Sequence, residues 1–123
     1  LFCQSKQFQD FKTLVPSVVY GNPEIAWIGK REQDIDGEYQ KSMIPISALA
    51  KSQCDNALDG MMKILVQDEK IVGAHIVSKE ASSLIQQISI AMAGKISVEQ
   101  LKAVCFAHPT YSEGLLECLM RLK

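Results

Sequence analysis

Two apolar runs on either side of a short polar segment constrain the fold of this chain more than any other feature. Residues 60–67 and 71–77 are rich in apolar side chains, and Asp68, Glu69 and Lys70 lie between them. Two such runs joined by a short polar loop predict an antiparallel β-hairpin. We expect this hairpin to form the centre of a β-sheet.

Four further segments have the composition of strands or short helical turns around that hairpin. Residues 15–20 are β-branched and aromatic, and residues 24–29 alternate polar and apolar side chains after a Gly-Asn-Pro turn. These two segments predict a pair of strands joined by a turn or bulge. Residues 39–46 predict another strand, with Pro45 near its end, where a missing backbone donor is least disruptive. The charged residues 30–36 predict one or two helical turns.

From residue 81 the spacing of apolar side chains changes to three and four residues. The positions that follow this spacing are Ala81, Leu84, Ile85, Ile88, Ala91 and Met92. Such a period predicts an amphipathic helix, and Gly94 is placed to end it. This is the strongest helical pattern in the chain.

Shorter helices are predicted by their capping residues. Ser97 and Gln100 have the spacing of a capping box for a short helix through Val104. Ser47 is expected to cap a short helix over residues 48–51. A last helix is predicted to present one apolar face, formed by Leu115, Leu116, Leu119 and Met120.

These elements predict one α+β domain. Strands dominate the first part of the chain and helices the second, which favours an antiparallel sheet of four to five strands with helices packed mainly on one side. A length of 123 residues suits a single core. We place the domain at residues 14–123 and interpret residues 1–13 as a poorly defined lead from an upstream domain. The start at Leu1 indicates a fragment of a longer protein.

Composition excludes several classes of partner. The formal net charge is -1, with 22% charged residues, so there is no electrostatic basis for binding nucleic acid or an anionic membrane. No apolar run reaches the roughly 20 residues of a membrane-spanning helix, and the N-terminus lacks the pattern of a signal peptide. We expect a soluble, cytoplasmic protein.

The cysteines and histidines do not predict a metal centre. The cysteines form neither a C-x-x-C motif nor a close redox pair, and we expect all of them to be reduced thiols: Cys3, Cys54, Cys105 and Cys118. His75 is interpreted as a hydrogen-bonded strand histidine, Trp27 as core or interface packing, and the pair Met61 and Met62 as core filling.

His108 is the candidate for acid–base chemistry. It precedes Pro109, which disfavours helix at His108 and makes a cis peptide inexpensive, and Glu113 follows five residues later. A carboxylate bonded to one ring nitrogen would fix the tautomer of the imidazole and stabilise its charged form. However, Thr110 and Glu113 also have the spacing of a capping box, with Thr110 as the N-cap. From these residues alone, both interpretations of Glu113 remain open.

Five ordered blocks of sequence resemble one family. They are residues 16–20, 23–29, 73–77 and 81–85, followed by the His-Pro-Thr-x-Ser-Glu segment at 108–113. Together they resemble the C-terminal dimerisation domain of dihydrolipoyl dehydrogenase, within the flavoprotein disulfide reductases. The chain departs from the usual pattern at Gly21, Ser78 and Phe106. Glutathione reductase also carries a His-Pro-Thr segment and is the alternative, as is a non-catalytic self-association module.

The resemblance implies a division of labour between domains and subunits. FAD, NAD and a redox-active cysteine pair would belong to upstream domains, so no cofactor is expected in this chain alone and the isolated chain is expected to be inactive. In a homodimer, His108 would take a proton from a dihydrolipoyl thiol at the partner subunit's disulfide, and Glu113 would orient His108. Pro109 would lie near the partner's flavin, with a cis peptide bond before it.

The same resemblance implies the wider setting of the enzyme. Its macromolecular partners would be the lipoyl domains of 2-oxoacid dehydrogenase or glycine cleavage complexes. The location would be the cytoplasm, or the mitochondrial matrix in a eukaryote.

Overall fold

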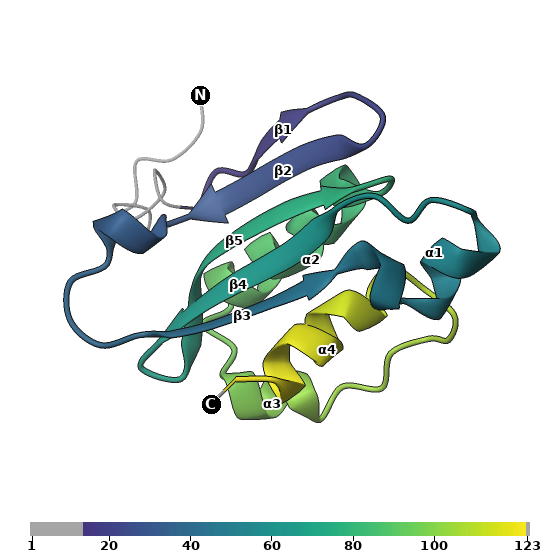
Figure 1. Ribbon diagram of the computed structural model, residues 1–123. Helices are drawn as coiled ribbons and strands as arrows, with labels where there is room; N and C mark the ends of the chain where they lie inside the picture. The colour runs from purple at the N-terminus through teal and green to yellow at the C-terminus, as the bar shows by residue number, and fades with distance from the viewer. Residues whose placement is uncertain (1–13, 123) are drawn as a thin grey trace, which may run out of the picture.

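The computed structural model describes residues 14–122, so the predicted lead at residues 1–13, with Cys3, and the terminal Lys123 lie outside the described residues. Within residues 14–122 the chain forms a five-stranded antiparallel sheet with α-helices against one face (Figure 1). This arrangement confirms the α+β fold class predicted from the sequence.

The strands follow the spatial order β1-β2-β5-β4-β3. Their bounds are β1 (Ser17–Val19), β2 (Glu24–Gly29), β3 (Gln40–Pro45), β4 (Met61–Gln67) and β5 (Lys70–Ser78). The predicted hairpin is the pair β4 and β5, and β5 is the central strand. Asp68 and Glu69 at its turn both have positive φ, 50° and 60°. Two consecutive left-handed residues give a turn whose twist matches that of the strands it joins.

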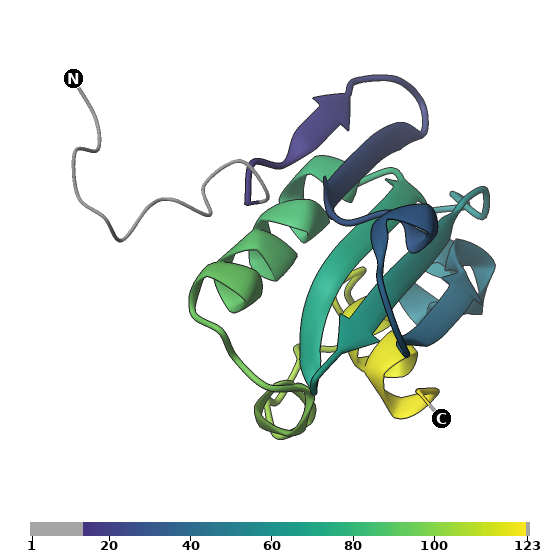
Figure 2. The ribbon, with the colours of Figure 1, turned by 90° about the vertical axis from the view of Figure 1, so that its left-hand side faces the viewer.

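The helices form a layer on one face of the sheet. Their bounds are α1 (Ala50–Cys54), α2 (Ala81–Ala93), α3 (Val98–Lys102) and α4 (Glu113–Met120), with short 3-10 turns at η3 (Glu32–Asp34) and η4 (Ile46–Ala48). Helix α2 packs on β2 and β5, and α4 packs on β3 and β4. Figure 2 shows α2 lying along the face of the sheet. A single buried core joins both helices to the sheet, and its members include Ile28, Ile64, Ile76, Ile85 and Leu119.

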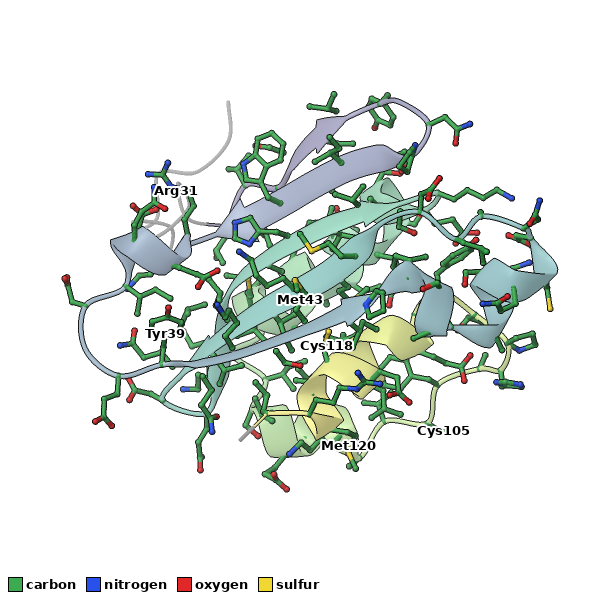
Figure 3. All side chains as sticks on the ribbon, in the orientation of Figure 1. Arg31, Tyr39, Met43, Cys105, Cys118 and Met120 are labelled. Carbon is green, nitrogen blue, oxygen red and sulfur yellow. The ribbon has the colours of Figure 1, made fainter. Side chains whose placement is uncertain are left out.

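The other face of the sheet exposes apolar side chains. Successive side chains of a strand point to opposite faces, so Ala26 and Ile28 are buried in the core while Ile25 and Trp27 are 44% and 39% exposed. Met43 on β3 is 59% exposed on this face (Figure 3). Trp27 is therefore a surface residue of the sheet rather than part of the buried core, and packing at an interface, the other half of its sequence interpretation, stays a prediction.

The short helix near residue 50 begins later than the sequence predicts. Ser47 lies inside η4 rather than at a cap, and Leu49 is the N-cap of α1. The cause is burial, because Ile46 and Leu49 are 0% and 3% exposed and the chain must turn between them. The Ser52 hydroxyl lies 2.7 Å from the carbonyl oxygens of both Ile46 and Leu49, and its single proton is donated to one or the other, which stabilises the turn.

The predicted ends of α2 and α3 are correct except for one detail in each helix. Helix α2 stops at Gly94 as predicted, but the left-handed residue is Lys95, with a φ of 53°. The Ser97–Gln100 capping box is present. Helix α3 ends at Lys102 rather than at Val104, which is 49% exposed.

The predicted apolar face of the last helix is correct in part. Leu115 and Leu119 are 4% and 0% exposed, whereas Met120 is 65% exposed and projects away from the sheet in Figure 3. The buried stripe is completed by Gly114 and Cys118. It is therefore rotated from the predicted face, because small residues let α4 approach β3 and β4 closely.

Candidate functional site

His108 lies in the connection between α3 and α4, and its peptide bond to Pro109 is cis, as the resemblance implies. The imidazole side chain is 69% exposed, whereas the Glu113 side chain is only 25% exposed. Glu113 is the first residue of α4. The turn through Pro109 brings the two side chains together at the start of this helix.

Glu113 makes both contacts that the sequence left open. Its Oε1 lies 2.8 Å from Nδ1 of His108, and its Oε2 accepts the backbone N–H of Thr110 at 2.8 Å. The predicted N-cap is wrong, however, because Thr110 donates its hydroxyl to the carbonyl oxygen of Ala107 at 2.7 Å and Ser112 precedes the helix. A carboxylate has two oxygens, so orienting the imidazole and holding the turn are compatible.

The charge state of this pair determines which nitrogen of His108 is basic. The backbone hydrogen bond from Thr110, followed by the hydrogen bond with His108, lowers the pKa of Glu113 below its usual value. An ionised carboxylate only accepts hydrogen bonds, so the neutral imidazole carries its proton on Nδ1. Its lone pair is then on Nε2, on the far edge of the ring, where a substrate proton can be accepted.

Two side-chain contacts from other elements hold the segment between His108 and Glu113. Tyr111 is 1% exposed, and its hydroxyl donates to Oδ2 of Asp55 at 3.3 Å. Gln87 on α2 donates to the hydroxyl oxygen of Ser112 at 2.8 Å. Sequence reasoning missed Asp55 and Gln87, because contacts between positions so far apart in the chain leave no local pattern.

The remaining sequence candidates lie away from this turn. His75 is on β5, where its cross-strand neighbours are Trp27 and Lys63. Its Nδ1 is buried and has no hydrogen-bond partner among residues 14–122, so the prediction of a hydrogen-bonded strand histidine is wrong at that atom. Burial lowers the pKa of His75. Met62 is buried in the core as predicted, whereas Met61 is only partly buried.

The described cysteines are separate from the candidate pair. Cys54 and Cys105 are free and exposed, and Cys118 is free and buried. Within the described part of the chain, no cluster of three or more His, Cys, Asp or Glu side chains is suited to a metal ion. Nor does any helix between residues 14 and 122 have the length and apolar character needed to cross a membrane.

Comparison with known families identifies the family of the chain. A family model described as the dimerisation domain of pyridine nucleotide-disulphide oxidoreductases matches residues 15–118. The chain belongs to this family. As a dimerisation domain of these oxidoreductases, it carries the His108–Glu113 pair at the start of its last helix.

Individual relatives confirm the resemblance to dihydrolipoyl dehydrogenase. The mitochondrial dihydrolipoyl dehydrogenase of Sus scrofa is 38% identical over 108 residues, which are 84% of this chain and 21% of the relative. The mitochondrial enzyme of Homo sapiens is 37% identical, with the same coverage of 84% and 21%. The chain thus spans about a fifth of the length of these relatives.

Solved structures agree on the dimerisation-domain fold. LpdA from Mycobacterium tuberculosis superposes with a TM-score of 0.82 at 26% identity, covering 89% of this chain and 25% of that protein. RclA, a HOCl-induced flavoprotein disulfide reductase from Escherichia coli, gives a TM-score of 0.84 at 22% identity, with 89% and 26% covered. The likeness to RclA supports the fold alone.

Proposed function

We propose that this chain is the C-terminal dimerisation domain of a dihydrolipoyl dehydrogenase and contributes the acid–base pair His108 and Glu113 to a site completed by a partner subunit. The observation that supports the proposal is the 2.8 Å contact between Nδ1 of His108 and Oε1 of Glu113, with the imidazole 69% exposed.

The chemistry assigned to this chain is proton transfer. Nε2 of His108 takes the proton from a thiol of a dihydrolipoyl group, and the resulting thiolate attacks the disulfide of the partner subunit. The ionised Glu113 stabilises the imidazolium that forms, because a charge-assisted hydrogen bond is stronger than a neutral one. The attack forms a mixed disulfide with one cysteine of the partner subunit and releases the other cysteine as a thiolate, to which His108 returns the proton. The second dihydrolipoyl thiol then displaces the first cysteine, so the lipoyl group leaves as a disulfide and the cysteine pair is left reduced.

The cofactors of such an enzyme, FAD and NAD, do not fit the residues described here. The connection between β5 and α2 consists of Lys79 and Glu80, and the connection between β4 and β5 contains Asp68 and Glu69. Neither contains a glycine, whereas a phosphate loop needs glycines between a strand and a helix. We assign both cofactors, and the redox cysteines, to other parts of the complete enzyme, with Pro109 near the partner's flavin.

The test of the base is His108→Gln in the complete enzyme. Loss of a general base should slow dihydrolipoyl oxidation by about 10²–10⁴-fold. His75→Gln is the matched control, since it makes the same substitution on the face of the sheet that the helices do not cover. It should leave turnover within a few-fold of the wild-type value. Near wild-type turnover of His108→Gln would refute the proposed role.

Self-association follows from the same proposal, because a half site requires a partner. Ile90 and Met120, on α2 and α4, are apolar and 61% and 65% exposed, and they belong to the helical layer that also carries His108. We propose that this layer faces the second subunit in an isologous homodimer. Ile90→Asp should give monomers in analytical ultracentrifugation, whereas Met43→Asp on the opposite face should not.

The substrate and the location are further parts of the proposal. The substrates would be lipoyl domains of 2-oxoacid dehydrogenase or glycine cleavage complexes, in the cytoplasm or in the matrix of a mitochondrion. A glutathione reductase is the alternative. Its signature would be oxidation of NADPH by glutathione disulfide, and faster turnover with that disulfide than with a dihydrolipoyl substrate would favour it.

A further inference from the structure

We propose that Tyr111 and Asp55 are positioning residues that hold the His108–Glu113 pair in its productive geometry. This inference rests on the proposed function and deepens it. Tyr111 lies three residues after His108 and two before Glu113, so it occupies the middle of the turn that brings the pair together.

Tyr111 anchors this turn to the core. Tyr111 is 1% exposed, whereas the His108 side chain is 69% exposed, so the turn has one side chain buried in the core and one exposed to solvent. The Tyr111 hydroxyl donates to Oδ2 of Asp55 at 3.3 Å. Burial raises the pKa of Tyr111, and the nearby Asp55 adds to the effect, so the hydroxyl keeps its proton and remains a donor.

Asp55 is itself fixed by cations from two elements. Lys51 on α1 contacts Oδ1 at 2.8 Å, and Lys79 after β5 contacts Oδ2 at 3.2 Å. The Asp55 side chain is 15% exposed, and the hydrogen bonds from both lysines lower its pKa. An ionised, partly buried carboxylate with two partners is a rigid acceptor for the Tyr111 hydroxyl.

The same turn is also held by α2. Gln87 donates to Oγ of Ser112 at 2.8 Å, and Ser112 directly precedes Glu113. Tyr111 is therefore tied to the C-cap of α1 and Ser112 to α2. Because two neighbouring residues of the turn are tied to other elements, the imidazole and the carboxylate meet without either side chain being buried in a pocket of its own.

Catalysis is sensitive to such support, because small displacements of a catalytic group are costly. Loss of the Tyr111 hydroxyl should widen the range of positions that His108 samples relative to Glu113. A weaker contact with the carboxylate stabilises the imidazolium less, so the step that forms the imidazolium becomes slower. A residue that only stabilises the fold would not slow that step alone.

The experiment is Tyr111→Phe in the complete enzyme, with kcat and KM of dihydrolipoyl oxidation as the readouts. We expect kcat to fall several-fold with KM nearly unchanged, because the weakened contact acts on the proton transfer and not on substrate binding. NADH oxidation with ferricyanide needs no dithiol, so its rate should be unchanged. Asp55→Ala should reproduce these effects, and Asp55→Asn, which keeps an acceptor oxygen, should lie between it and wild type.

Tyr39→Phe is the matched control, because the Tyr39 hydroxyl also donates to a carboxylate, Oε2 of Glu32, at 3.3 Å. It should behave as wild type. A Tyr111→Phe enzyme with wild-type kcat for dihydrolipoyl oxidation, or one that loses both reactions equally, would overturn the inference. If Tyr111→Phe is inert while His108→Gln is slow, only the positioning role fails. If His108→Gln is also inert, the proposed function fails too.

Discussion

Replacing Glu113 with glutamine tests the chemistry of the pair more sharply than removing the side chain, because the substitution keeps the size and changes only the charge and one hydrogen-bonding group. Glu113 accepts two hydrogen bonds, from Thr110 N–H and from Nδ1 of His108, each at 2.8 Å. Glutamine has one acceptor oxygen and one donor group. If the glutamine oxygen keeps the hydrogen bond from the Thr110 N–H, the NH₂ group faces His108 and Nδ1 must accept a hydrogen bond from it. The imidazole proton then lies on Nε2, so Nε2 has no lone pair left to accept a proton.

The opposite orientation of glutamine preserves the correct tautomer at a cost. Its NH₂ group then faces the Thr110 N–H, which loses its acceptor, and an unsatisfied donor at this partly buried position costs up to about 1–3 kcal/mol. The active orientation is disfavoured by that amount, which corresponds to roughly 5- to 150-fold in rate. Glutamine also lacks the charge that stabilises the imidazolium. We therefore expect kcat for dihydrolipoyl oxidation to fall between about 10-fold and 10²-fold.

The assay is steady-state oxidation of dihydrolipoamide by NAD, with the ferricyanide reaction measured in parallel. Glu117→Gln is the control on the same helix, since Glu117 pairs with Arg121 at 3.6 Å on an exposed surface. It should leave both reactions unchanged. The reasoning would be falsified if Glu113→Gln retained more than half of the wild-type kcat while its folded content was intact.

Three further predictions concern the fold. Leu119→Ala should lower the free energy of unfolding by about 2–5 kcal/mol in urea titrations, whereas Met120→Ala should change it by less than about 0.5 kcal/mol. Equal losses of stability would contradict the assigned buried face of α4. Burial raises the pKa of the Cys118 thiol to about 11. Iodoacetamide at pH 8 should therefore label Cys54 and Cys105 but not Cys118 until the protein unfolds, and labelling of all three at one rate would refute the burial of Cys118. Gly60 has a φ of 125° and an added Cβ would overlap the Val77 carbonyl oxygen, so Gly60→Ala should destabilise by more than about 2 kcal/mol. Gly37→Ala, with a φ of 84° but open space around the Cβ, should cost less, and an equal cost would show that the overlap is relieved.

The sequence predicted those parts of the fold that depend on neighbours along the chain. The apolar runs at 60–67 and 71–77 became β4 and β5, and the spacing from Ala81 to Met92 became α2. The Ser97–Gln100 capping box involves residues only three positions apart, and it is present in the structure. In each case, hydrogen bonding and burial follow from residues within a few positions of one another.

The errors arose where distant contacts overrode local preference. Ser47 is a good helix cap, yet burial of Ile46 and Leu49 moved the helix start beyond it. Met120 continues an apolar period, but α4 buries the stripe of Gly114 and Cys118 that fits closest to the sheet. Local spacing does not reveal which face of a short helix meets its partner.

The candidate site was predictable only in its local half. The spacing of His108 and Glu113 indicated that they could meet, and the resemblance implied the cis bond. The contact between Asp55 and Tyr111 spans 56 positions and joins α1 to the turn before α4. No sequence motif indicates such a pair, because its two residues are far apart along the chain and meet only when the elements between them, including β4, β5 and α2, have folded.

The central claim is that His108 serves a site on the other subunit, and mixed dimers test it directly. One subunit carries His108→Gln with its redox cysteines intact, and the other carries His108 with those cysteines replaced by serine. Each variant alone should be inactive. After random pairing, about half of the dimers are mixed and each has one intact site, so we predict recovery of about a quarter of wild-type activity. No recovery in verified mixed dimers would show that His108 acts within its own subunit or not at all.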